Sequence, residues 1–159
     1  MNKLLLFLLM LVFVTSCSPA PEPAPISNDA SLSAVATIDR FYTLINMAQA
    51  ENDFGKPWDM LSFEDQCNAR YQCNLDKFQA RWWPSKVFYR LYDCGSNTVM
   101  AAEMRYPRDT DPSTLPAVSQ YWTYELIDSD GTMLIGKTRL SQAPGDGCIL
   151  AIEFVGENK

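Results

Sequence analysis

The chain has 159 residues with 13 Lys and Arg against 19 Asp and Glu, a net charge of −6 at pH 7, and no histidine. The acidic balance argues against nucleic acid as a partner, because nucleic acid rewards clustered Lys and Arg. The lack of histidine excludes Ser-His and Cys-His catalytic systems and removes the side chain best suited to proton transfer near neutral pH.

An apolar run near the start of the chain predicts an export signal. Residues 4–14 are all apolar, follow Lys3, and are succeeded by Thr15, Ser16 and Cys17. One basic residue, a short apolar core and small residues at its end are typical of a secretory signal peptide. The run is too short to span a bilayer, which needs roughly 20 apolar residues.

Residues 14–17, Val-Thr-Ser-Cys, resemble the lipobox of bacterial lipoproteins. The resemblance implies that Cys17 receives a diacylglycerol and becomes the first residue of the mature chain. Two or three acyl chains would hold the protein on a membrane, since burial gives about 0.8 kcal/mol per CH₂. In that family the residue after the cysteine biases sorting, and Ser18 implies the outer membrane of a diderm host. The alternative is an ordinary signal peptide in which Cys17 carries no lipid.

Four cysteines follow Cys17, and an even number in an exported chain predicts two disulfides. Four thiols allow three pairings, and the spacing favours Cys67 with Cys73 and Cys94 with Cys148. We expect no metal site, because Cys-x₅-Cys is not a zinc spacing and histidine is absent. No glycine-rich phosphate loop is present, so no cofactor is expected.

The rest of the chain divides into a tether and one domain. Prolines at every second position from 19 to 25 favour extended polyproline geometry. We therefore expect a lipoprotein signal peptide at 1–16, a lipidated, proline-rich tether at 17–28 and a single α+β domain at 29–159. A domain of that length can bury one adequate core.

Helical patterns occupy the first half of the domain. Apolar residues recur at helical spacing between positions 35 and 48, which predicts an amphipathic helix of about five turns. A short helix is expected at 56–61. Ser62 and Asp65 fit a capping box that opens another short helix carrying Cys67. Asn74 should cap a third, over 75–83, which Pro84 closes.

Beyond Pro84 the pattern alternates, which predicts strands at 87–92, 98–106, 118–127, 132–140 and 148–155. Asp130-Gly131 is the strongest hairpin signal. Residues 128–131 also begin like a calcium loop, but the later ligands do not follow. Helices first and an antiparallel meander afterwards predict an α+β fold.

This order of elements resembles the NTF2-like, or cystatin-like, superfamily. The resemblance is carried by residues 35–48, by residues 58–62 (Trp-Asp-Met-Leu-Ser) and by the strands. It implies a curved sheet of four to five strands around a long N-terminal helix, a cone-shaped interior, and dimerisation through the sheet as in many relatives. The superfamily contains both enzymes and non-catalytic domains, so the fold leaves function open.

Four carboxylates are candidates for proton transfer: Asp39, Glu103, Glu125 and Glu153. One of them, buried beside a tyrosine, would have a raised pKa and could move protons; the tyrosines in question are Tyr42, Tyr89 and Tyr124. The favoured alternative places the three glutamates on the solvated face, paired across strands with the basic residues Arg90, Arg105, Lys137 and Arg139. We therefore assign no catalytic residue.

Aromatic residues are the remaining feature, and most should be core. The adjacent Trp82 and Trp83 cannot easily both face inward, so an exposed binding surface is expected there. Trp122 and Tyr124 share one strand face and would continue that surface or line the cone. The expected function is a non-catalytic binding or assembly module with an envelope protein partner. The alternatives are a carrier or sensor of a small apolar ligand, or a histidine-free acid-base enzyme.

Overall fold

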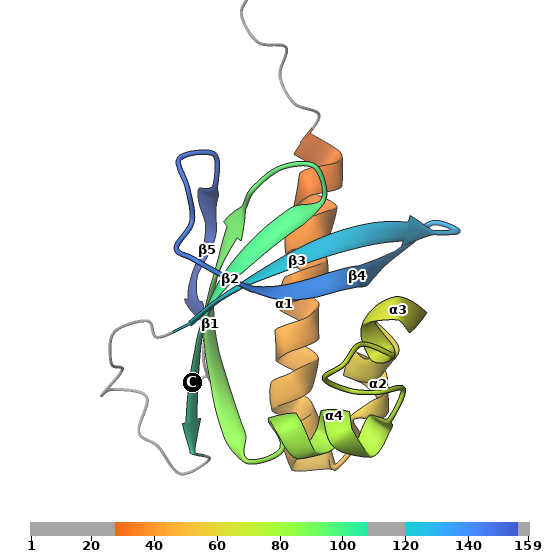
Figure 1. Ribbon diagram of the computed structural model, residues 1–159. Coiled ribbons are helices and arrows are strands. Elements are labelled where there is room, and N and C mark those ends of the chain that lie inside the picture. Colours follow the sequence, from red (N-terminus) through yellow and green to blue (C-terminus); the bar gives the residue numbers. More distant parts are fainter. Residues whose placement is uncertain (1–27, 108–119, 156–159) are drawn as a thin grey trace, which may run out of the picture.

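The computed structural model describes residues 28–107 and 120–155 (Figure 1). The signal peptide, Cys17 and the tether up to residue 27 lie outside the described residues. The described part is α+β, with short helices and a five-stranded antiparallel open sheet. The predicted α+β class, with short helices and an antiparallel sheet, is thereby confirmed.

The helices pack inside the curve of the sheet and at one end of it (Figure 1). The first, α1 (Asn28–Glu51), lies against the concave face. Three short helices follow near the end of α1: α2 (Gly55–Trp58), α3 (Phe63–Gln66) and α4 (Leu75–Trp82). In the described ranges, no helix is both long and apolar enough to cross a membrane.

The strands lie close to their predicted positions. Their bounds are β1 (Ser85–Asp93), β2 (Thr98–Pro107), β3 (Gln120–Ser129), β4 (Thr132–Ser141) and β5 (Ile149–Val155). The spatial order is β4-β3-β2-β1-β5, so the first four strands form the predicted meander. The fifth does not continue it, because β5 pairs with β1 at the opposite edge from β4.

Both disulfides join the predicted cysteines. Cys67 is bonded to Cys73 and closes the loop between α3 and α4. Cys94 follows β1 and is bonded to Cys148, which precedes β5. The second disulfide therefore links β5, the strand that departs from the meander, to its pairing partner β1.

The predicted caps form, with one difference at α3. Asn74 accepts a hydrogen bond from the Lys77 amide at 3.1 Å, and Ser62 Oγ accepts one from the Asp65 amide at 3.2 Å. The Asp65 carboxylate does not complete a capping box. It accepts instead from the amide and hydroxyl of Thr138, at 3.1 and 2.8 Å. This buried contact ties α3 to β4.

The turn at Asp130 and Gly131 is a two-residue hairpin. Both residues have positive φ, 54° and 79°, as the hairpin turn that matches strand twist requires. The Gly131 amide donates to Asp128 Oδ1 at 2.8 Å, so that carboxylate serves the turn. Within the described residues no three acidic, cysteine or histidine side chains gather to hold a metal ion.

Candidate functional site

The predicted tryptophan surface is mostly buried. Trp82 is 3% exposed, and Trp122 and Tyr124 are also buried. Trp82 faces the core because it lies on the buried side of α4, with its ring 5.9 Å from that of Phe41. Trp83 caps the end of α4 and is half-buried against Phe54. Trp82, Trp122 and Tyr124 therefore line the interior, and of the four residues predicted for the surface only Trp83 is partly exposed.

A buried network of hydroxyls and charge lies between α1 and the sheet. The Tyr42 hydroxyl donates to Glu103 Oε2 at 2.9 Å and lies 2.6 Å from the Tyr124 hydroxyl. Since the Tyr42 proton is directed at Glu103, the hydrogen bond between the tyrosines must be donated by Tyr124. Arg105 Nε donates to Glu103 Oε1 at 2.6 Å. Every hydroxyl proton and both carboxylate oxygens are thereby used inside the protein.

The solvated-face interpretation holds for two of the three glutamates. Glu125 pairs with Arg139 at 3.0 Å, and Glu153 pairs with Arg90. Glu103 is the exception at 1% exposed, because its strand position faces α1.

Asp39 also meets a tyrosine, since it accepts from the Tyr89 hydroxyl at 2.8 Å. The structure thus brings two of the candidate carboxylates to the predicted tyrosines.

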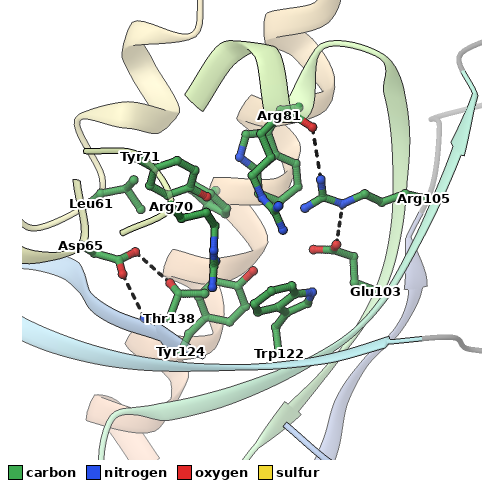
Figure 2. A pocket seen from close by; sticks show the side chains of 12 residues that line it. Leu61, Asp65, Arg70, Tyr71, Arg81, Glu103, Arg105, Trp122, Tyr124 and Thr138 are labelled. Atoms are coloured by element: carbon green, nitrogen blue, oxygen red, sulfur yellow. Dashed lines mark hydrogen bonds and ion pairs between the residues drawn. The ribbon is translucent and has the colours of Figure 1, made fainter. Parts of the chain in front are cut away.

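Next to this network is a small cavity between the helical end and the sheet (Figure 2). Its volume is about 10 Å³, which is room for roughly one water. The lining residues come from α1, α3 and α4, from the loop that the Cys67–Cys73 disulfide closes, and from the sheet; they include Arg70, Arg81, Arg105, Glu103, Asp65, Trp82, Trp122 and Tyr124.

Three arginines gather around two tryptophan rings in this cavity. The Arg70 guanidinium lies 4.5 Å from the centre of the Trp122 ring, and that of Arg81 lies 5.5 Å from it. Arg105 lies 3.8 Å from the Trp82 ring. In Figure 2, Arg70 and Arg81 extend toward Trp122 from the helical side. Burial lowers the pKa of Arg81, and repulsion from Arg105 lowers it further.

Arg70 is positioned by the geometry of the disulfide loop. Asn68 Oδ1 accepts from the Arg70 amide at 2.8 Å and from the Tyr71 amide at 3.0 Å. The Cys67–Cys73 bond closes that loop. The sequence analysis missed Arg70 and Arg81 because no motif links them. The available signal was that an aromatic residue directly follows each arginine in the chain.

The buried tyrosines predict a loss of stability at high pH. Burial raises the pKa of Tyr42 and Tyr124 well above the usual value, and the charge of Glu103 adds to both shifts. Above about pH 10 the unfolded chain releases protons that the folded protein retains, so each such tyrosine lowers the free energy of unfolding by about 1.4 kcal/mol per pH unit. Below that pH the contribution is fully present.

The measurement follows tyrosinate absorbance and circular dichroism together as pH rises. We expect these tyrosines to ionise only as the fold is lost. Full ionisation of all seven tyrosines near pH 10 with the fold intact would contradict the buried network.

Comparison with protein-family models, with curated proteins and with solved structures found no match to this chain.

Proposed function

We propose that the chain is a lipid-anchored cell-envelope protein whose NTF2-like domain is a non-catalytic module that binds a small molecule in the arginine–tryptophan cavity. The observation that carries the proposal is a group of buried donors without an acceptor among the described residues, in side chains that line the cavity: Nε of Arg81 and Nε1 of Trp82 and of Trp122. Buried polar groups are normally hydrogen-bonded, and unpaired donors facing a cavity suit a bound acceptor.

The hydrogen-bond network beside the cavity favours binding over catalysis. Tyr42, Tyr124 and Glu103 satisfy one another and Arg105, so their protons are committed within the protein. A raised tyrosine pKa keeps both hydroxyls neutral at ordinary pH. The second candidate function is a histidine-free acid-base enzyme. It requires a carboxylate buried beside a tyrosine, and Glu103 beside Tyr42 meets that requirement.

The anchoring part of the proposal rests on residues 14–17 and on the export signal before them. Two further features are typical of exported, anchored proteins. The cysteines are paired in disulfides, and the proline-rich segment is long enough to hold a domain away from a bilayer. The NTF2-like assignment is supported by the antiparallel sheet curving around α1 (Figure 1). Placement at an outer membrane rests on Ser18 alone.

The test isolates the full-length protein from the membranes of its own cells in mild detergent and examines it by native mass spectrometry. We expect the mass of an acylated chain plus a bound small molecule. Turnover of that molecule on incubation would favour the enzyme instead.

The Cys17→Ala variant is the control for anchoring. It should leave the membrane fraction while its folded domain still carries the small molecule. A variant that stays on the membrane would contradict the lipid anchor. An empty cavity with a co-purifying protein would replace the ligand-binding role with an assembly role.

A further inference from the structure

The cavity holds positive charge that the chain itself does not balance. Three arginines line it, against the carboxylates of Glu103 and Asp65. Arg105 is paired with Glu103 at 2.6 Å. Arg70 and Arg81 make no ion pair with any of the described residues. One positive charge is therefore left over around this cavity, in a protein whose net charge is −6.

The unbalanced charge coincides with donors that lack acceptors. Trp122 is 95% buried, since 5% of it is exposed, and its Nε1 has no hydrogen-bond partner within the described ranges. Nε of the partly buried Arg81, whose guanidinium lies 5.5 Å from the centre of the Trp122 ring, is likewise a buried atom without a partner among the described residues. An acceptor with a negative charge would satisfy both donors and relieve the repulsion among the guanidinium groups.

We propose that this cavity binds the carboxylate group of a small organic monoanion, held by Arg70, Arg81 and Trp122. The assignment rests on the proposed ligand-binding function and names the ligand class for that site. A planar guanidinium pairs with a planar carboxylate through two parallel hydrogen bonds. A single negative charge matches the one left unbalanced, whereas a phosphate dianion would face repulsion from Glu103 and Asp65.

The ligand enters by displacing the Arg70 side chain. The cavity of about 10 Å³ is too small for a carboxylate and its organic body while the Arg70 guanidinium covers Trp122 at 4.5 Å. Arg70 is half-buried on a loop, and no hydrogen bond from its guanidinium to a described residue fixes it. The space that the Arg70 side chain vacates then accepts the apolar part of the ligand, while the Arg70 guanidinium turns to the carboxylate.

The experiment measures calorimetric binding of sodium benzoate to the full chain in detergent. Benzamide is the neutral probe of the same shape, and sodium phosphate at equal ionic strength is the second anion. The variants are Arg70→Gln and Arg81→Gln. Arg139→Gln is the matched control, because that exposed arginine pairs with Glu125 and does not line the cavity.

We expect benzoate to bind at one site, with affinity weakened about tenfold or more by either cavity variant and unchanged by the control. If Arg81→Gln fails to fold, Arg70→Gln on the surface loop decides the question. Wild-type affinity in Arg70→Gln, or binding of phosphate without benzoate, would overturn the inference.

Benzamide separates this inference from the proposed function. Equal binding of benzamide and benzoate would overturn the carboxylate assignment and keep a ligand-binding cavity. Binding of neither, together with no co-purified molecule, would overturn both.

Discussion

Replacing Cys94 and Cys148 with serine is expected to lower the free energy of unfolding by about 4 kcal/mol. The bond spans 54 residues, so it removes a large part of the conformational entropy of the unfolded chain. It also holds β5 beside β1, at the edge that the meander does not reach. Urea unfolding of the oxidised wild type and of the double variant measures the difference.

The other disulfide is the matched control for this prediction. Cys67 and Cys73 are six residues apart, and their replacement should cost about 2 kcal/mol by the same loop-length argument. Equal losses from the two double variants would show that loop length does not set the stabilisation here. The Cys67–Cys73 variant should in addition loosen the loop that positions Arg70.

Replacing Glu103 with alanine is expected to cost about 3 kcal/mol of stability at neutral pH. The change leaves the Tyr42 hydroxyl without its acceptor and the partly buried Arg105 without its ion-pair partner. Breaking a buried pair from one side is costly because the remaining charge keeps its desolvation penalty. Chemical unfolding at pH 7 provides the measurement.

Glu125→Ala is the control for Glu103→Ala. Glu125 also pairs with an arginine on the sheet, but both side chains of that pair are exposed, so the loss should stay below about 1 kcal/mol. A second variant, Glu103→Gln, keeps an acceptor for the Tyr42 hydroxyl. Its loss of stability should lie between the losses caused by Glu103→Ala and Glu125→Ala. Losses of equal size from Glu103→Ala and Glu125→Ala would show that burial of the network contributes nothing.

Local signals predicted most of the elements because their physical causes are local. Alternation of apolar residues identified the strands, and the Asp130-Gly131 pair identified a hairpin that needs two left-handed residues. Asn74 capped the helix that its position indicated. The cysteine pairing also followed from spacing.

Sequence reasoning failed where a long-range contact competed with a local one. Asp65 was predicted to complete a capping box with Ser62, but its carboxylate is taken by Thr138, 73 residues away. An exposed surface was predicted at Trp82 and Trp83 because adjacent tryptophans cannot easily both face inward. The packing of α4 on Phe41 buries Trp82 and leaves only Trp83 partly exposed. Neither contact can be deduced from neighbours in the chain.

The sequence by itself determined the α+β class, the order of the strands along the chain and the two disulfides, because periodicity, turn residues and cysteine spacing act over short stretches. Only the tertiary structure decided that Glu103 is buried beside Tyr42 and Tyr124, and that Arg70 and Arg81 meet over Trp122. Strand alternation leaves open which face is buried until a helix covers it. The candidate site exists because residues of α1, α4, the disulfide loop and the sheet, which are far apart in the chain, line the same cavity.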